Sequence, residues 1–175
     1  FNEGYLPEHE GHKIYFMEVG NPKGRPIISF HGGPGYWSKI SKAQIFDLEN
    51  ERVILFDQRG WGKSMPAGEM KNNTAAKLVD DAKRLLDFLK IKKKVIVRGG
   101  SWGSALARLF AEKYPSMVDK LVLSQIFLAN EDDLKWSYET SGLFYPEFLE
   151  KMMGKSKDKM EMLKSYADLI SSKNM

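Results

Sequence analysis

The stretch that decides the fold reads Val95-Ile96-Val97-Arg98-Gly99-Gly100-Ser101-Trp102-Gly103, followed by small and apolar residues up to Tyr114. The apolar run predicts a buried strand, and the residues after Gly103 predict a helix. Between them, a Gly-x-Ser-x-Gly pattern fills a sharp strand-to-helix turn. Side chains at Gly99 and Gly103 would collide there with the neighbouring strand and helix. The turn therefore predicts that Ser101 is a nucleophile, held in a strained backbone conformation with its hydroxyl exposed.

Backbone N–H groups at this turn are expected to stabilise negative charge. A helix that begins near Trp102 directs its free N–H groups and a partial positive charge toward Ser101. A second donor is expected from the glycine-rich loop His31 to Gly35. Each such donor contributes roughly 3 kcal/mol of transition-state stabilisation. The alternative, a purely structural or phosphate-binding turn, is disfavoured because no lysine follows as in a P-loop.

Short apolar runs alternate with helical patterns along the first two thirds of the chain. The pattern predicts an α/β fold, a mostly parallel sheet with crossover helices. We expect an early hairpin (4–7 with 14–19), strands at 27–30, 53–56, 95–97 and 121–123, and helices at 78–89, capped by Thr74, and at 105–114.

The character of the sequence changes from about Ala129 onward, where acidic, aromatic and Met-rich segments predict helices. We expect residues 1–125 to form a core domain and residues 126–175 to begin a helical cap. In the last helix, an apolar stripe is expected to pack as ordinary core: Met160, Leu163, Ala167 and Ile170.

Composition excludes several classes of function. The chain has 175 residues, of which 42% are hydrophobic, and a formal net charge of +4. It contains no cysteine, and this absence excludes disulfides, thiolate metal sites and a cysteine nucleophile. The lysine run at 90–94 predicts a solvent-facing turn rather than a nucleic-acid site. No membrane span or leader peptide is visible, so we expect a cytoplasmic protein that binds neither membrane nor nucleic acid.

Three motifs in fixed order together resemble the proline iminopeptidases, a branch of the α/β-hydrolases. They are His31-Gly32-Gly33-Pro34-Gly35, Asp57-Gln58-Arg59-Gly60-Trp61-Gly62-Lys63-Ser64 and Gly99-Gly100-Ser101-Trp102-Gly103. The resemblance extends from about Tyr5 to Glu150. It implies the α/β-hydrolase fold and release of N-terminal proline from peptides through an acyl-enzyme on Ser101. It also implies that Gly33 and Trp102 donate the oxyanion-hole N–H groups, with no cofactor and no metal.

The resemblance further implies a substrate pocket. Phe127 stands where the family has a phenylalanine that lines the proline-ring pocket, although it could also be plain core. The family's Trp-Tyr-Tyr run reads Trp136-Ser137-Tyr138 here. Either Ser137 replaces a pocket tyrosine or Tyr138 takes over its role, and Tyr138 is the expected pocket residue. Arg98 replaces a bulky apolar residue, and a buried arginine requires an acidic or carbonyl partner.

The triad order in this fold is Ser, then Asp or Glu, then His, but no histidine follows Ser101. Relative to the family, the fold is therefore expected to be incomplete, with the last core strands missing. We expect a second polypeptide to supply the triad Asp and His and to cover the unpaired strand edge at 120–124. His31, an alternative base, is expected instead to hold its loop by hydrogen bonds.

Two other functions stay open at this point. One is an esterase or another α/β-hydrolase with a different acyl substrate. The other is a non-catalytic binding module that keeps the serine turn but has lost the triad.

Overall fold

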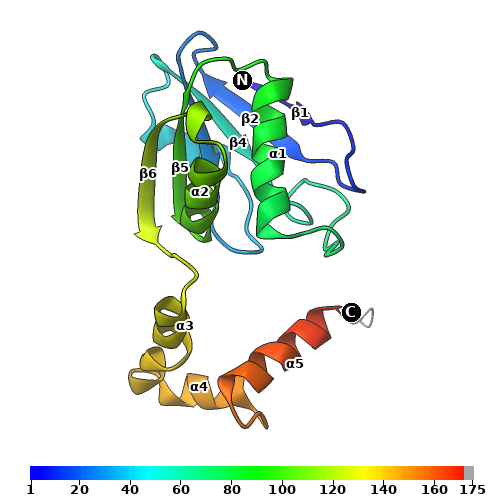
Figure 1. Cartoon of the computed structure of the whole chain (residues 1–175), viewed down its shortest axis with the longest axis vertical. Coiled ribbons are helices and arrows are strands. Elements are labelled where there is room, and N and C mark those ends of the chain that lie inside the picture. Colours follow the sequence, from blue (N-terminus) through cyan, green and yellow to red (C-terminus); the bar gives the residue numbers. More distant parts are fainter. Residues whose placement is uncertain (172–175) are drawn as a thin grey trace. The chain divides into compact units, whose positions relative to one another are not determined.

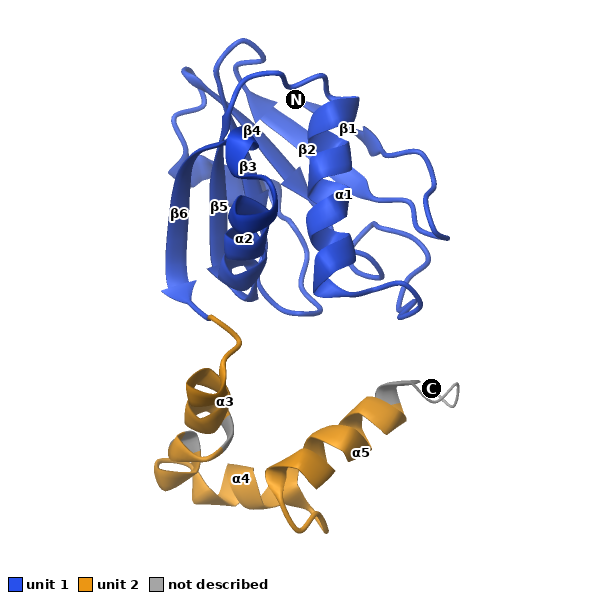
Figure 2. Ribbon diagram, viewed as in Figure 1, with its two compact units in different colours: residues 1–127 blue, residues 128–175 orange. Residues whose placement is uncertain are grey.

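The computed structural model describes residues 1–171, apart from the side chains of Tyr138, Ser141, Ile170 and Ser171. The chain forms two compact units, residues 1–127 and the segment that begins at Leu128 (Figure 2).

Six strands form a single sheet in unit 1. Their bounds are β1 Asn2–Tyr5, β2 Tyr15–Gly20, β3 Arg25–Phe30, β4 Glu51–Phe56, β5 Val95–Ser101 and β6 Val118–Ile126, and their order is β1-β2-β4-β3-β5-β6. The pairs β1–β2 and β2–β4 are antiparallel, whereas β3–β4, β3–β5 and β5–β6 are parallel. The predicted hairpin and the predicted mostly parallel sheet are both confirmed.

Two helices cover one face of this sheet (Figure 1). They are α1, Ala75–Phe88, which connects β4 to β5, and α2, Trp102–Lys113, which connects β5 to β6. The side chain of Thr74 accepts a hydrogen bond from the backbone N–H of Lys77 and so caps α1, as predicted. The exposed lysines at 90 and 92–94 lie at the turn between α1 and β5, which confirms their solvent-facing prediction.

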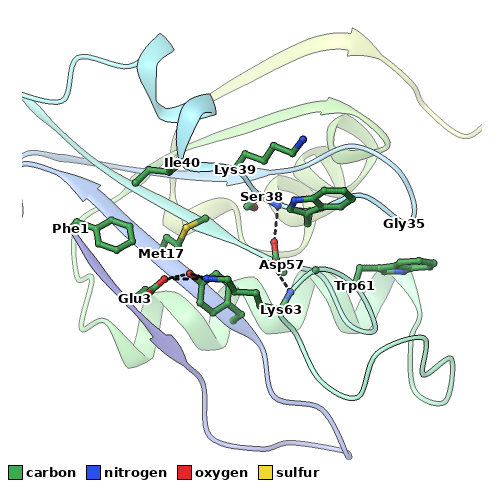
Figure 3. Close-up of a pocket in the computed structure, with 13 residues that line it drawn as sticks. Phe1, Glu3, Met17, Gly35, Ser38, Lys39, Ile40, Asp57, Trp61 and Lys63 are labelled. Carbon is green, nitrogen blue, oxygen red and sulfur yellow. Dashed lines mark hydrogen bonds and ion pairs between the residues drawn. The ribbon is translucent and has the colours of Figure 1, made fainter.

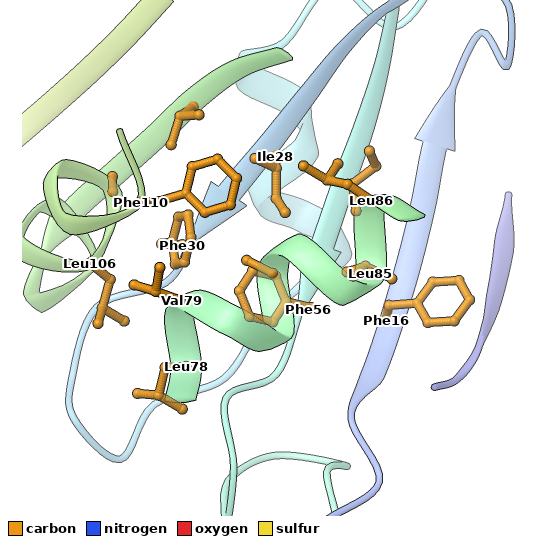
Figure 4. Close-up of a cluster of buried hydrophobic side chains, with 14 of the residues drawn as sticks. Phe16, Ile28, Phe30, Phe56, Leu78, Val79, Leu85, Leu86, Leu106 and Phe110 are labelled. Atoms are coloured by element: carbon orange, nitrogen blue, oxygen red, sulfur yellow. The ribbon is translucent and has the colours of Figure 1, made fainter. Parts of the chain in front are cut away.

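The core lies between the two helices and the sheet. Apolar residues of β3, β4 and β5 interdigitate with the inner faces of the helices, and Phe30 packs edge-on against Phe56 at 5.3 Å between ring centroids (Figure 4). Central parallel strands are buried on both faces, which explains why β3 and β4 read as continuous apolar runs. On the opposite face, Ala43 and Phe46, in and just after the 3₁₀ helix η1 (Ile40–Ile45), pack on β2 and β4.

A buried ion pair fastens the segment after β4 to α1. Arg59 is fully buried and donates two hydrogen bonds to the carboxylate of Asp81, at 2.6 and 2.9 Å. Its remaining donors reach Glu10 at 3.0 Å and the carbonyl oxygen of Asn72 at 2.7 Å. A guanidinium removed from water is tolerated only when its donors are satisfied in this way.

Strand β6 is an edge of the sheet within the described residues and pairs with β5 alone. It is longer than predicted, and its apolar residues are unusually accessible: Leu121 is 40% exposed, Val122 47% and Ile126 61%. Neighbours in a strand point to opposite faces. The exposure of both Leu121 and Val122 therefore shows that neither face of β6 is fully covered.

Unit 2 consists of short helices: α3 Glu131–Tyr138, the 3₁₀ helix η3 Thr140–Leu143, α4 Pro146–Met153 and α5 Lys159–Ser171. The predicted apolar stripe of α5 is wrong, because Met160 is 69% exposed while Met162 is buried. The side chain of Ile170 lies outside the described residues. No described helix is long and apolar enough to cross a membrane.

Replacing Asp81 by Asn should lower the free energy of unfolding by about 3 kcal/mol or more, because it removes the buried, bidentate one of the two carboxylates that pair with the guanidinium of Arg59 and leaves only the partly exposed Glu10. Urea denaturation followed by circular dichroism would measure the change. The matched control is Asp87→Asn, which breaks the exposed i,i+4 pair with Lys83 and should cost under about 1 kcal/mol. Equal costs for the two variants would contradict the assigned importance of the Arg59 network.

Candidate active site

Ser101 occupies a strained turn between β5 and α2. Its backbone dihedrals, φ 54° and ψ −128°, are rarely adopted by a residue with a side chain, and the residue is exposed. The bend lets the strand pass directly into the helix, so that Ser101 stands at the junction. The strained conformation and exposed side chain predicted for this residue are confirmed.

The two glycines of the turn are required by close backbone contacts. A β-carbon at Gly103 would collide with the carbonyl oxygen of Phe30 and lie 2.7 Å from that of His31. A β-carbon at Gly99 would collide with the carbonyl oxygen of Gly103 and lie 2.8 Å from the β-carbon of Ala107. The start of α2 therefore packs directly against the end of β3, as the sequence predicted.

This contact brings the loop after β3 beside the nucleophile. A β-carbon at Gly32 would lie 3.4 Å from Cβ of Ser101 and 4.0 Å from its Oγ. The next residue, Gly33, has φ 129°, a conformation that favours glycine. Trp102 is the first residue of α2, so its N–H has no acceptor within the helix. The assignment of these two N–H groups to an oxyanion hole stays a prediction.

Gln58 ties the loop to the turn. Its side-chain N–H donates to the carbonyl oxygen of His31 at 2.9 Å, and its side-chain oxygen accepts from the indole N–H of Trp102 at 3.0 Å. One amide therefore connects the end of β3 with the first residue of α2. Gln58 lies within the motif from Asp57 to Ser64, but no separate role was predicted for it.

His31 is engaged at both ring nitrogens. Nδ1 lies 2.7 Å from the carbonyl oxygen of Gly32, which can only accept, so Nδ1 carries the proton. Nε2 accepts the backbone N–H of Gln58 at 3.1 Å. Burial lowers the pKa of His31, against the opposing effects of the Gly32 carbonyl and Asp57. His31 therefore holds its loop as predicted, and its only lone pair is already occupied.

Asp57 joins the two loops that border the site (Figure 3). Its carboxylate accepts the backbone N–H of Ser38 at 2.7 Å and that of Lys63 at 2.8 Å. Gly62 is required nearby, because a β-carbon there would collide with the Asp57 carboxylate. Asp57 is thus committed to backbone donors and supports the loops rather than the chemistry.

Phe127 is tied to the nucleophile turn through Ser104. The hydroxyl of Ser104 lies 2.6 Å from the carbonyl oxygen of Ser101 and accepts the backbone N–H of Phe127 at 2.8 Å. Phe127 is half-buried, and its role in lining the pocket stays a prediction. Sequence reasoning missed Ser104, since a buried serine in a helix carries no signal of the strand end it binds. The side chain of Tyr138 lies outside the described residues.

Two cavities border the loop from Gly35 to Lys39. The larger, about 820 Å³, is lined by Tyr15, Trp61 and Lys63 and does not include Ser101 (Figure 3). The smaller, about 420 Å³, is lined by Ser101, Gly32, Gly33 and Arg98. Because Ser101, the predicted nucleophile, lines the smaller cavity and not the larger one, the smaller cavity is the candidate substrate site.

The expected partner of Arg98 is absent from the described residues. Arg98 is half-buried, and its guanidinium lies 5.8 Å from the centroid of the Phe46 ring. The expectation of an acidic or carbonyl partner applied to a buried arginine, and this condition is not met, because the side chain is only half-buried and lines a cavity. The described residues also hold no cluster of three or more His, Cys, Asp or Glu side chains suited to a metal ion.

Known proteins resemble the chain along most of its length. Residues 25–160 match the family described as the alpha/beta hydrolase fold. Proline iminopeptidases from Arabidopsis thaliana and Neisseria gonorrhoeae are 40% and 39% identical to it over 86% and 87% of the chain, and the matches cover 40% and 50% of those relatives. The chain spans about half the length of the curated relatives it matches.

A solved structure agrees with the sequence relatives. The proline iminopeptidase-related protein from Thermus thermophilus matches with a TM-score of 0.62 at 28% identity, over 70% of this chain and 43% of that structure. The predicted resemblance and fold class are confirmed.

Replacing Gly99 by Ala should lower the free energy of unfolding by about 3 kcal/mol or more, because its new methyl group would meet backbone that cannot move aside. Thermal or urea unfolding would measure this loss. The control is Gly68→Ala: Gly68 has φ 71° and nothing within 4 Å, so the variant bears only backbone strain of about 1–2 kcal/mol. A Gly99 variant no less stable than the Gly68 variant would argue against the tight turn.

The lowered pKa of His31 predicts a loss of stability in mild acid. As the pH falls below the ordinary value of 6.5, the unfolded chain binds a proton before the folded chain does. The free energy of unfolding should therefore fall until the pH passes the lowered pKa, below which the loss is complete. Urea denaturation from pH 7.5 to 5 should show this slope in the wild type and a shallower one in His31→Gln. His9→Gln, at an exposed histidine, is the control and should keep the wild-type slope.

Proposed function

This chain belongs to the α/β-hydrolase fold family, and on that premise we propose that it carries the nucleophile of a proline iminopeptidase-type serine peptidase. The observation that carries the proposal is the geometry of Ser101, strained and exposed at a glycine-flanked turn beside the Gly32–Gly33 loop. The similarity to proline iminopeptidases supports proline as the residue released.

In the proposed reaction, Oγ of Ser101 attacks the carbonyl carbon of an N-terminal proline residue. A general base takes the hydroxyl proton, and the N–H groups of Gly33 and Trp102 stabilise the oxyanion, each by roughly 3 kcal/mol. The base then gives the proton to the leaving amine, which departs as the shortened peptide. Water, activated by the same base, cleaves the acyl-enzyme and releases proline.

The general base is proposed to come from outside this chain. The chain has three histidines, none of them after Ser101. Both ring nitrogens of His31 are engaged, and His12 is buried with Nε2 at 2.8 Å from the carbonyl oxygen of Lys71. His9 lies in the N-terminal segment, bridged by its backbone to His12. We propose that the triad Asp and His come from outside these 175 residues and that a second polypeptide supplies them.

The edge strand β6 supports this proposal. Its outer backbone donors and acceptors have no partner strand among the described residues, and Leu121 and Val122 are exposed on opposite faces. An apolar edge of this kind favours pairing with another strand. A polypeptide that adds a strand beside β6 would cover these groups and bring its acid and histidine to the same sheet as Ser101.

Phe127 is proposed to line the pocket for the proline ring. The link through Ser104 fixes its backbone next to the nucleophile turn, and its half-buried ring leaves apolar surface available. Tyr138 is retained as a second proposed pocket residue on the resemblance alone.

The proposal is tested with the chain co-expressed with a polypeptide that supplies the acid and histidine. We expect proline p-nitroanilide to be cleaved faster than the alanine and leucine anilides, and Ser101→Ala to lower kcat/KM about 10⁴-fold or more with an unchanged circular dichroism spectrum. Ser116→Ala, at an exposed serine, is the matched control and should retain full activity.

Three results would contradict parts of the proposal. Equal rates on all three anilides, or hydrolysis of simple esters alone, would indicate a different α/β-hydrolase. No labelling of Ser101 by a fluorophosphonate in the assembly would indicate a binding module. A monodisperse chain that cleaves proline anilide unaided would eliminate the second polypeptide.

A further inference from the structure

The charged side chains that line the cavity beside Ser101 are all positive. Its charged side chains are Lys39, Lys42 and Arg98, and no Asp or Glu is among its lining residues. A concave site with charges of one sign focuses the electric field and concentrates ions of the opposite sign. At about 420 Å³, the cavity has the size of sites that hold small ligands. These properties favour a small anionic group next to the nucleophile.

Arg98 differs from every other arginine of the chain. The other five each form an ion pair with a carboxylate: Arg25, Arg52, Arg59, Arg84 and Arg108. Arg98 forms no ion pair or hydrogen bond among the described residues, and its guanidinium lies over the Phe46 ring, 5.8 Å from the centroid. Its five N–H donors are thus available to a ligand.

The backbone fixes Arg98 close to the chemistry. It lies three residues before Ser101 in the same strand, in register with Ser29 of β3 and Val122 of β6. Central strands of a sheet are rigid, and a cation based on one is better positioned than a cation on a loop. The ammonium group of Lys39, by contrast, already interacts with two aromatic rings. It lies 5.3 Å from the ring centroid of Tyr36 and 4.9 Å from that of Trp37.

We propose that Arg98 binds the C-terminal carboxylate of a short substrate, and that this site is therefore selective for proline dipeptides over longer or C-terminally blocked peptides. The inference rests on the proposed function. A proline dipeptide carries a protonated amine at one end and a carboxylate at the other. The cationic cavity repels the amine and attracts the carboxylate, which orients the dipeptide with its leaving residue in the cavity. Guanidinium and carboxylate form paired, charge-assisted hydrogen bonds.

The test compares Pro-Ala with Pro-Ala-amide in the assembly that hydrolyses proline anilide. We expect the wild type to cleave Pro-Ala with a kcat/KM roughly tenfold or more above that for the amide. The reason is that the amide lacks the carboxylate and so loses one charge-assisted interaction with Arg98. Arg98→Gln should reduce this ratio to near one, and Arg98→Lys should give an intermediate value, because it keeps the charge but loses the paired geometry. Lys94→Gln, at an exposed lysine outside the cavity, should keep the wild-type ratio.

A binding measurement covers variants with poor activity. In a Ser101→Ala background, calorimetry should show tighter binding of Pro-Ala than of Pro-Ala-amide, and Arg98→Gln should remove the difference. The inference is overturned if wild type shows no preference, or if Arg98→Gln lowers kcat/KM equally for both substrates. An equal loss together with weaker association of the two polypeptides would assign Arg98 to a carboxylate of the second polypeptide instead. If proline anilide itself is not cleaved, the proposed function fails, whereas cleavage without carboxylate preference overturns only the role of Arg98.

Discussion

The candidate site depends on the direct contact of Gly103 with the end of β3. Without a β-carbon at this position, the first turn of α2 can pack on the carbonyl groups of Phe30 and His31. That contact holds the first turn of α2 against the carboxyl end of β3, and Ser101, just before this turn, lies against Gly32. Any side chain would push the helix away from β3 and separate the nucleophile from the loop that borders it.

The segment that follows β4 stabilises this arrangement with three consecutive polar residues. Asp57 binds backbone donors of both loops, Gln58 links His31 to Trp102, and Arg59 forms the buried pair with Asp81 of α1. None of the three is free to act on a substrate, because each side chain is already fully engaged. A motif rich in ionisable and polar groups therefore serves as a scaffold, and the turn that carries Ser101 is held in place by side chains that bind other parts of the chain.

Much of the fold could be predicted from the sequence, because short local patterns of residues specify its strands, turns and helices. The β-branched run before Gly99 and the glycine spacing around Ser101 specify a strand, a turn and a helix within a few residues, and Thr74 marks the start of α1. Features that depend on distant partners could not be predicted. Ser104 of α2 accepts a hydrogen bond from Phe127, which follows β6, and Arg98 lines a cavity. Neither contact is indicated by the residues next to it in the sequence. In α5, Met162 rather than the predicted stripe is buried, because the apolar residues there fit more than one helical face.

Tryptophan fluorescence can report on the loops around Ser101, because several of the tryptophans lie in or beside these loops. Three of the four tryptophans lie at this site: Trp37 is stacked on Tyr36 at 4.9 Å, Trp61 borders Gly35, and the indole N–H of Trp102 is bonded to Gln58. Indole emission shifts with hydrogen bonding and with access of water to the ring. Trp37 lines both cavities and Trp61 lines the larger one, whereas Trp102 lines neither. Two of the three tryptophans of unit 1 are therefore placed to change their emission when a ligand enters the larger cavity, and Trp37 is so placed for the smaller one.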